Sequence, residues 1–331
     1  MRILVIGGTQ FVGRHLVAAA IGAGHEVTVL HRGVSCSGAP GARHLHADRD
    51  GDLSILEGQA WDATVDVCAY WPSQVRSLSA ALGDRGGRHV LISTVSVYAD
   101  PPEPGLDERA PLLAPLGLDG ERPPIDGATY GRLKVGCEHV AERRYGGELL
   151  VIRPTYIVGP HDPTARFPYW VQRLARGGTV LCPGSPTAPF QYVDGRDLAR
   201  FTLHLLEDGD VGAFHAVHPA APYSFAEMLE EVRAAVSPEG TELRWVPSAW
   251  LVERGITPAV LPLWSGADEP EFALAMDPAL AVQNGLRARP LGQTAADTLA
   301  WCQEPSTRWD ARGALLSPER EAELLSEWAG R

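Results

Sequence analysis

The chain begins with an apolar run that leads directly into a glycine-rich turn and an amphipathic segment. Residues 2–6 end in four apolar side chains and are followed by Gly7-Gly8. Residues 11–23 then carry apolar side chains at about the helical period, with a further glycine at Gly13. Glycines allow a tight turn and close approach of the backbone, and a helix N-terminus presents free N–H groups and a partial positive charge. The segment therefore predicts a strand, a phosphate-binding turn and a helix, in the order typical of a dinucleotide-binding domain.

Further short apolar runs alternate with helical patterns through the first half of the chain. We expect strands at 26–30, 64–68, 89–93 and 148–152, and a helix at 129–145. Near-continuous apolar strands separated by helices indicate a parallel sheet that is covered on both faces. Right-handed crossovers make such a sheet doubly wound. The sequence therefore predicts an α/β fold with a Rossmann-type doubly wound parallel sheet.

The second half of the chain is less regular. Helical patterns recur at 194–206 and 224–236, and three tryptophans lie among prolines between residues 245 and 264. We expect an NAD(P)-binding Rossmann domain at 1–165, and a smaller, interwoven C-terminal lobe, mainly for the substrate, at 166–331. Residues 190–217 are expected to return to the first domain through strands near 190–193 and 213–217.

The composition excludes several classes of function. The chain has 29 basic and 41 acidic residues, a net charge of -12, whereas a nucleic-acid partner needs a dense basic face. This balance also disfavours an anionic membrane, and no apolar run is long enough for a membrane-spanning helix. Five widely spaced cysteines indicate free thiols in a reducing compartment, so we expect a cytoplasmic protein. The spacing of cysteines and histidines fits no metal site.

The glycine-rich turn supplies the first expected cofactor contacts. Gln10 stands where such turns usually have their middle glycine, which leaves close approach of the backbone open at that position. The expected contacts of the turn are Gly7, Thr9, Gln10, Phe11, Val12 and Gly13.

The end of the second strand indicates the type of nicotinamide cofactor. NAD enzymes place an acidic side chain there to bind the ribose hydroxyls, but residues 27–33 contain no acid. Arg32 can instead pair with a 2′-phosphate. We therefore expect NADP(H), with NAD(H) as the alternative. Asp48 is expected to bind the adenine amino group or, almost equally, to cap nearby N–H groups of its loop.

Tyr130 and Lys134 form the most informative motif, because residues four apart share one face of a helix. An ammonium beside a phenol favours the phenolate and lowers the pKa of the phenol. A phenol tuned in this way can exchange a proton with a substrate oxygen while hydride moves. Ser93, Thr94 and Ser96 follow the fourth strand, at the edge where parallel sheets bind ligands, so one of these hydroxyls can bond to the same oxygen.

Residues 100–127 interrupt the alternation of strands and helices. They hold seven prolines and seven acidic residues with little periodicity. A loop of this length in a compact domain is usually functional. Two interpretations stay open, a lid over the substrate and a solvated surface excursion.

These segments, together with Val151-Ile152-Arg153-Pro154 and the stretch from Gln191 to Ala199, give the chain a resemblance to the extended short-chain dehydrogenase/reductase family, of the NAD-dependent epimerase/dehydratase type. The Gly-Gly-x-x-x-x-Gly turn resembles an atypical subgroup of that family. The resemblance implies that Thr94 is the catalytic hydroxyl, Tyr130 the acid/base and Lys134 its partner. It also implies cofactor contacts at Ala69, Tyr130, Lys134 and Pro154, with Lys134 at the nicotinamide ribose.

The resemblance places further residues near a small-molecule substrate. The expected substrate contacts are Tyr70, Ser96, His161, Arg166, Trp170 and Gln191. Val95 and Ser96 stand where sugar-nucleotide dehydratases carry Asp-Glu, and Phe190 stands where many sugar-nucleotide epimerases carry an arginine. Both departures count against those two activities.

The resemblance and the motifs together leave three functions open. The first is an oxidoreductase that reduces a carbonyl, or oxidises an alcohol, of a small polar or sugar-like substrate. The second is a redox-neutral sugar epimerase that retains NAD. The third is a non-catalytic NAD(P)- or RNA-binding protein, against which the net charge and the Tyr130/Lys134 pair argue. The family is often dimeric, so a homodimer is expected.

Overall fold

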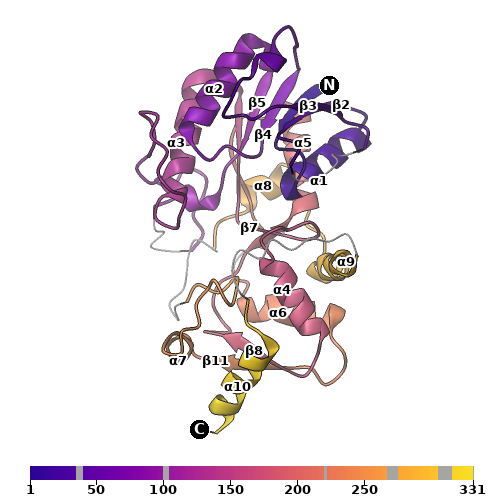
Figure 1. The fold of residues 1–331 in the computed structure, drawn as a ribbon, viewed down its shortest axis with the longest axis vertical. Helices are drawn as coiled ribbons and strands as arrows, with labels where there is room; N and C mark the ends of the chain where they lie inside the picture. Colours follow the sequence, from indigo (N-terminus) through magenta and orange to yellow (C-terminus); the bar gives the residue numbers. More distant parts are fainter. Residues whose placement is uncertain (35–39, 100–103, 220–221, 267–274, 305–314, 331) are drawn as a thin grey trace.

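A seven-stranded sheet forms the centre of the N-terminal part of the computed structural model (Figure 1), which describes residues 1–34, 40–99, 104–219, 222–266, 275–304 and 315–330. All neighbouring strands pair in parallel, in the order β10-β6-β5-β4-β1-β2-β3. The order reverses between β1 and β4, which is where doubly wound sheets bind ligands. The strands are β1 (Arg2–Ile6), β2 (Glu26–His31), β3 (Arg43–His46), β4 (Ala63–Asp66), β5 (Arg88–Ile92), β6 (Leu149–Pro154) and β10 (Gly212–Ala216).

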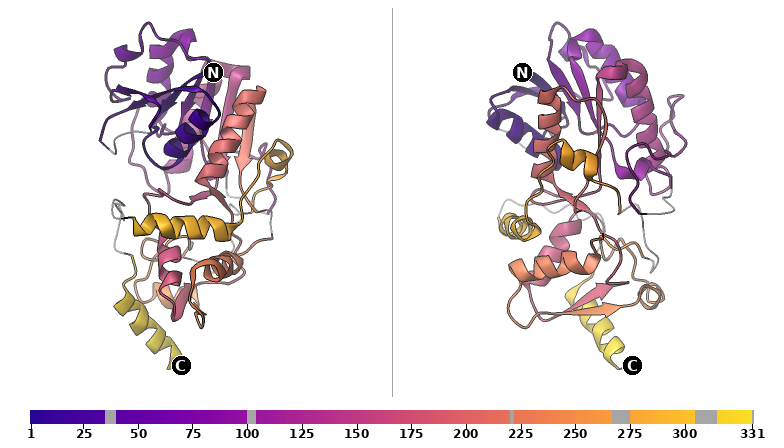
Figure 2. Two further views of the ribbon diagram at one scale, coloured as in Figure 1. Left: turned by 90° about the vertical axis from the view of Figure 1, so that its right-hand side faces the viewer. Right: turned by 180° about the vertical axis from the view of Figure 1, so that it is seen from behind.

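Helices cover both faces of this sheet. α1 (Phe11–Gly22) packs beside α5 (Gly195–Asp208) on one face, and α2 (Pro72–Leu82) packs beside α3 (Tyr130–Tyr145) on the other (Figure 2). Successive side chains of a strand point to opposite faces, so every second residue of β1 joins the same cluster. Ile3 and Val5 pack with α1 and α5, whereas Leu4 and Ile6 pack with α2. The predicted doubly wound fold is confirmed.

The C-terminal lobe packs around a second, largely aromatic core. α4 (Arg166–Ala175), α6 (Phe225–Val236) and α9 (Leu291–Gln303) contact one another in this lobe. A two-stranded parallel sheet of β8 (Thr179–Pro183) and β11 (Glu242–Val246) lies beside them. The short helix α7 (Ser248–Val252) and the longer α10 (Pro318–Ala329) complete this lobe, whereas the short helix α8 (Ala279–Gln283) contacts β10 of the central sheet. The two chain ends lie at opposite poles of the molecule (Figure 1).

Two segments connect the lobes. β10 pairs with β6 at the edge of the central sheet, as expected for the strand near 213–217. The strand expected near 190–193 is β9 (Tyr192–Asp194), but it pairs with β7 (Tyr156–Val158) in a separate two-stranded sheet. The short strand β3, in which Leu45 alone is buried, was not expected from the sequence. Among the described residues, no helix has the length and apolar character needed to span a bilayer.

The second part of the segment 104–127 is fastened to α2 and α3, whereas its first part bonds elsewhere: the Gly105 N–H donates to the Ala275 carbonyl at 2.6 Å, and the Arg153 guanidinium donates to the Glu108 carbonyl at 2.9 Å. The Leu116 N–H donates to the Arg132 carbonyl at 3.0 Å. The Arg122 guanidinium donates to Asp50 at 2.7 Å and to Ser73 at 3.0 Å. These bonds hold Leu116 and Arg122 against the two helices. A role over the substrate stays a prediction, and residues 100–103 lie outside the described part of the chain.

Candidate functional site

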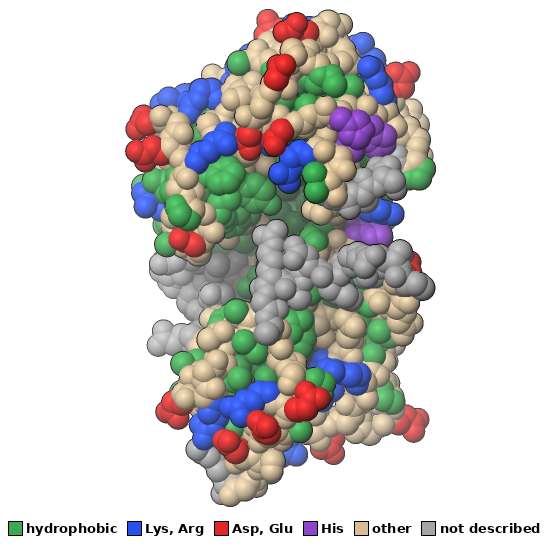
Figure 3. Space-filling view, in the orientation of Figure 1, with side chains coloured by type: hydrophobic (Ala, Val, Ile, Leu, Met, Phe, Trp, Pro, Cys, Tyr) green, Lys and Arg blue, Asp and Glu red, His purple; other side chains and the backbone are tan. Residues whose placement is uncertain are grey.

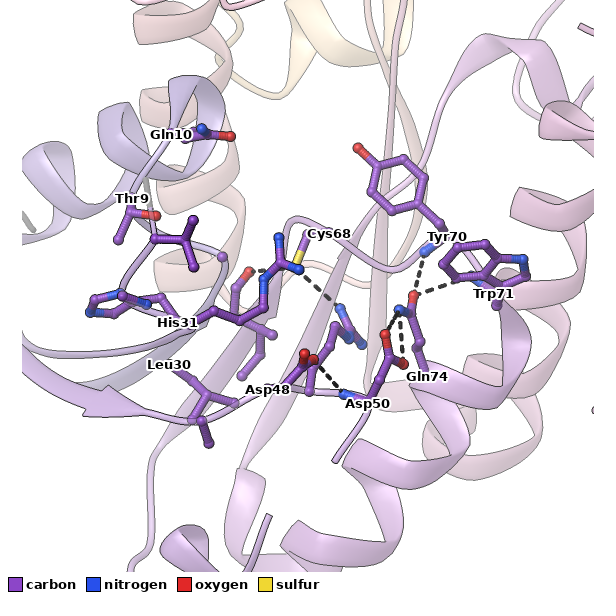
Figure 4. Close-up of a pocket in the computed structure, with 17 residues that line it drawn as sticks. Thr9, Gln10, Leu30, His31, Asp48, Asp50, Cys68, Tyr70, Trp71 and Gln74 are labelled. Carbon is purple, nitrogen blue, oxygen red and sulfur yellow. Dashed lines mark hydrogen bonds between the residues drawn. The ribbon is translucent and has the colours of Figure 1, made fainter. Parts of the chain in front are cut away.

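A cavity of about 270 Å³ opens at the carboxyl ends of the strands, beside the point where the strand order reverses (Figure 4). Its walls come from the turn after β1, the ends of β2 and β3, and the loop from β4 into α2. Five of the predicted cofactor contacts line it, namely Gly7, Thr9, Gln10, Arg32 and Asp48. Tyr70, which we expected to contact the substrate, lines this cavity as well.

The glycines of the turn are required by close contacts. Gly7 has a φ of 88°, and a Cβ atom there would lie 2.7 Å from the Cys68 Sγ atom. A Cβ atom on Gly13 would lie 2.2 Å from the Gly7 carbonyl oxygen. Any side chain at either position would therefore fill or deform the turn. This cradle fits the pyrophosphate of a dinucleotide, for which the backbone must approach closely.

Gln10 does not obstruct the turn. It is the N-cap of α1, with φ −128° and ψ 150°, a conformation open to every residue type. Its side chain makes no capping hydrogen bond to the helix. Phe11, the first residue of α1, has a φ of 34°. α1 therefore begins directly after Thr9 and Gln10, which line the cavity, and the N-terminus of a helix favours an anion.

A buried ion pair forms the floor of the cavity. Arg49 donates to both carboxylate oxygens of Asp66, at 2.7 and 2.8 Å, and also to the Cys68 sulfur at 3.3 Å. Asp66 is 0% exposed, and the Cys68 N–H donates to it at 3.1 Å. Burial raises the pKa of the Asp66 carboxyl, but the Arg49 charge and hydrogen bonds outweigh burial and lower it overall. The pair holds the ends of β3 and β4 together.

The outer wall is built from the start of α2. The Gln74 side chain accepts from the N–H groups of Tyr70 and Trp71, at 2.9 and 3.2 Å, and donates to Asp50 at 3.0 and 3.1 Å (Figure 4). Asp48 lines the cavity and also accepts from the Asp50 N–H at 3.0 Å. The capping role of Asp48 is therefore present, and contact with adenine stays a prediction.

Lys134 is buried where the ends of two strands meet. Its ammonium donates to the carbonyl oxygens of Ala69 at 2.8 Å and Ile92 at 2.7 Å. An ammonium has three N–H donors, and these two bonds use two of them. Lys134 is thus locked between the residues that follow β4 and end β5. Ala69 takes part through its backbone carbonyl.

Tyr130 opens α3, close to the Thr94 hydroxyl. Burial raises the pKa of the Tyr130 phenol, while the Thr94 hydroxyl and the Arg166 charge lower it by less. The prediction that Lys134 lowers this pKa is wrong, because burial has the largest effect and raises it, while the Lys134 ammonium donates to two backbone carbonyls. Thr94 lies just beyond β5, where it accepts from the Ser96 N–H and donates to the Ser96 hydroxyl, both at 3.2 Å. The exposed Ser96 thus orients Thr94.

Two expected substrate contacts need correction. Trp170 is 0% exposed, and its indole N–H donates to the Pro262 carbonyl at 2.7 Å within the C-terminal core. Gln191 is also 0% exposed, and its amide bonds to the carbonyls of Pro219 and Met276 and to the Met276 N–H. Both side chains are held inside the protein. A buried polar group requires such bonds. The Trp170 and Gln191 side chains therefore hold the protein interior together and are not assigned to the substrate.

Arg166 and His161, the other two expected substrate contacts, lie in different surroundings. Arg166 begins α4, donates to the Thr164 hydroxyl at 2.9 Å and lies over the Tyr156 ring. Its charge reaches the Tyr130 phenol, which places it on the side of the proposed acid. The His161 ring packs against His15 of α1 and Trp301 of α9. Pro154 is the last residue of β6, and its contact with the cofactor stays a prediction.

Sequence reasoning missed the Arg49–Asp66 pair and Gln74. Asp66 ends an apolar strand, and an acid at a buried position demands a partner. That signal was present, but the identity of the partner depends on how β3 and β4 are placed. Among the described residues, no group of three or more metal-binding side chains is arranged around a common point.

Comparisons with known proteins agree with this arrangement. A model of the NAD dependent epimerase/dehydratase family matches residues 3–70 and 73–217. The chloroplast stem-loop binding protein of 41 kDa b of Arabidopsis thaliana is 26% identical over 62% of this chain and 55% of its own length. The isoflavone reductase homolog IRL of Zea mays is 26% identical over 64% of this chain and 62% of its own length. This chain therefore spans less than two thirds of either relative.

A solved structure shares the fold over almost the whole chain. The UDP-glucuronic acid 4-epimerase of Bacillus cereus, in complex with NAD, superposes with a TM-score of 0.66 and 15% identity, covering 93% of this chain and 100% of that one. The family match, the glycine cradle and the locked Lys134 lead to one conclusion. The chain belongs to the NAD-dependent epimerase/dehydratase family.

Proposed function

We propose that this protein is an NADP(H)-dependent reductase that acts on the carbonyl group of a small polar or sugar-like substrate. The observation that carries the cofactor choice is the end of β2. Arg32 lines the nucleotide cavity there, and residues 27–33 contain no acid to bind the ribose hydroxyls. A guanidinium binds a phosphate monoester by charge-assisted hydrogen bonds, so Arg32 would bind the 2′-phosphate.

The protein side of the reaction follows from three side chains. NADPH, when bound, would supply the hydride for the carbonyl carbon. The Tyr130 phenol would donate its proton to the carbonyl oxygen, and burial supports this role because it keeps the phenol protonated at neutral pH. The Thr94 hydroxyl would turn its single proton from the Ser96 hydroxyl to the same carbonyl oxygen. The third N–H of Lys134 would hold the nicotinamide ribose.

The surroundings of Tyr130 support a polar substrate. Arg166 brings a guanidinium to that side of the site, with its Nε atom committed to Thr164. The terminal nitrogens of the fork offer several further N–H donors to an oxygen-rich ligand. The isoflavone reductase homolog from maize is a relative named for a net reduction.

A redox-neutral epimerase is the second candidate. The solved structure of UDP-glucuronic acid 4-epimerase has the same fold and was determined with NAD. Against it, Phe190 is buried in the aromatic core, so it supplies no cation for a sugar nucleotide. An epimerase would keep the same NAD bound while hydride leaves the substrate and returns to it. A reductase must instead exchange its cofactor in each turnover.

The test is a fluorescence titration of the purified protein with NADPH and NADH, after its denatured supernatant has been checked for carried-over cofactor. We expect cofactor-free protein and a clear preference for NADPH that Arg32→Ala abolishes. Stoichiometric, tightly held NAD would refute the reductase and favour the epimerase. The Tyr130→Phe variant separates a third function, because a non-catalytic binding protein would keep its activity in this variant.

A further inference from the structure

Three histidines gather at the cavity edge where β2 and β3 end. His31 pairs with His46 in the register of the two strands, and His44 lies two residues before His46. The His31 ring centre is 5.0 Å from that of His44 and 4.6 Å from that of His46. Histidine side chains are visible together over this end of the strands in Figure 3. Of the three, His31 lines the nucleotide cavity, next to Arg32.

His31 and His44 form a directed hydrogen-bond relay. The Gly33 N–H donates to the His31 Nδ1 atom at 3.1 Å, so that nitrogen must be the acceptor of the ring. In a neutral imidazole the other nitrogen then carries the proton. The His31 Nε2 atom lies 2.9 Å from the His44 Nδ1 atom, to which it donates. The donations of the relay therefore run from the Gly33 N–H through the His31 ring to the His44 Nδ1 atom.

The environment of His31 favours this neutral form. His31 is 8% exposed. Burial, together with the adjacent rings of His46 and His44, lowers the pKa of His31. Both ring nitrogens are committed to internal bonds, so His31 offers no acceptor to a ribose hydroxyl although it stands beside the cavity.

The backbone that the relay holds is the turn that carries Arg32. Gly33 has a φ of 76°, in the left-handed region that favours glycine. A Cβ atom on Gly33 would lie 3.0 Å from the His46 Nδ1 atom, so His46 closes the far side of the turn. The turn is thus fixed from one side by a hydrogen bond and from the other by a ring.

We propose that His31 and His44 are positioning residues that select the phosphorylated cofactor, because their relay fixes the turn from which Arg32 meets the 2′-phosphate. This inference rests on the proposed function. A preorganised guanidinium loses less conformational entropy when the phosphate binds. NADH lacks that phosphate, so its affinity does not depend on where Arg32 is held. The expected signature is a change in the ratio of the two affinities.

The experiment compares matched variants by the dissociation constants of NADPH and NADH, measured by fluorescence titration at pH 7.5. In His31→Asn, the amide oxygen stands at the position of Nδ1 and can still accept from Gly33. In His31→Leu, that acceptor is lost. We expect His31→Leu to weaken NADPH binding about tenfold, the equivalent of one hydrogen bond, with NADH binding unchanged within about twofold. His31→Asn should retain most of the preference.

The second link and the proposed function are tested in the same assay. His44→Leu removes the acceptor for His31 Nε2 and should reduce the preference for NADPH, whereas His44→Asn keeps an acceptor at the position of Nδ1. This pair also serves if His31→Leu does not fold, as judged by its circular dichroism. Equal weakening of both cofactors, or an unchanged ratio, in His31→Leu and His44→Leu would overturn the relay. If the two leucine variants leave the ratio of affinities unchanged but Arg32→Ala weakens NADPH binding, the assignment of NADP(H) stands and only the relay is refuted. If Arg32→Ala has no effect either, both are overturned.

Discussion

Replacing Arg49 by methionine tests whether the ion pair under the cofactor cavity stabilises the fold. Arg49→Met preserves much of the side-chain length and removes the cation and its donors. Asp66 would keep the single bond from the Cys68 N–H and lose two charge-assisted bonds of 2.7 and 2.8 Å. With 0% exposure, its carboxylate has no access to bulk water. Removing one partner of a buried pair costs about 3–5 kcal/mol, and we expect a loss in that range.

A variant with both Arg49 and Asp66 replaced separates the interaction between the two side chains from the effect of each side chain alone. Asp66→Asn alone leaves a guanidinium that lines the cavity and can be hydrated from there. In Arg49→Met combined with Asp66→Asn, the remaining amide is neutral and needs no counter-charge. The double variant should therefore lose less stability than the sum of the single variants. The coupling free energy should be about 1–3 kcal/mol.

The assay is urea unfolding of the cofactor-free protein at pH 7, followed by far-UV circular dichroism. Equal denaturant slopes among the variants would show that only stability changed. The pKa of Asp66 is lowered in the folded protein, so its contribution is present above the ordinary carboxyl pKa and lost as the pH falls through the lowered value. At pH 7 the wild-type protein has the full contribution.

In Arg49→Met, the stability contribution of Asp66 should depend on pH in the opposite sense. Without Arg49, burial alone raises the pKa of Asp66, so protonation on going from pH 7 to pH 5 should narrow the gap to the wild type. A loss below about 1 kcal/mol in Arg49→Met, or single-variant losses that simply add, would refute the argument that the pair is a buried unit.

Four further predictions concern the proposed acid, the turn and the C-terminal core. Tyr130→Phe should lower kcat by about 10²–10⁴-fold in a coupled NADPH assay with an accepted carbonyl substrate, with the NADPH dissociation constant unchanged. Because the pKa of Tyr130 is raised, the phenol is protonated below it, so the reduction rate should stay level through neutral pH and fall only in strong alkali; a fall between pH 7 and 8 would contradict this assignment. Gly13→Ala puts a Cβ atom 2.2 Å from the Gly7 carbonyl, so cofactor titration should show more than tenfold weaker binding. Trp170→Phe removes the bond to Pro262 and should cost about 1–3 kcal/mol in urea unfolding while leaving cofactor affinity intact; altered catalysis with full stability would restore a substrate role.

Local patterns predicted the framework of this protein well. Each strand of the sheet interior is an apolar run, and the turn at Gly7 and Gly13 follows from the strand and helix around it. The spacing of Tyr130 and Lys134 placed both on the helix α3. β3 was missed because its four residues, with three basic or imidazole side chains, lack an apolar run. It becomes a strand by pairing with β2.

Short-range patterns specify the glycine cradle, the doubly wound fold and the candidate catalytic side chains, because each depends on residues close together along the chain. The contacts and the pKa directions of those side chains follow only from how the chain packs. Lys134 bonds to carbonyls 65 and 42 residues away, and Trp170 bonds to a carbonyl 92 residues away. Burial then raises the pKa of Tyr130, against the expectation from its helical neighbour. Desolvation and long-range partners are properties of the packed chain, and no pattern along the sequence specifies them.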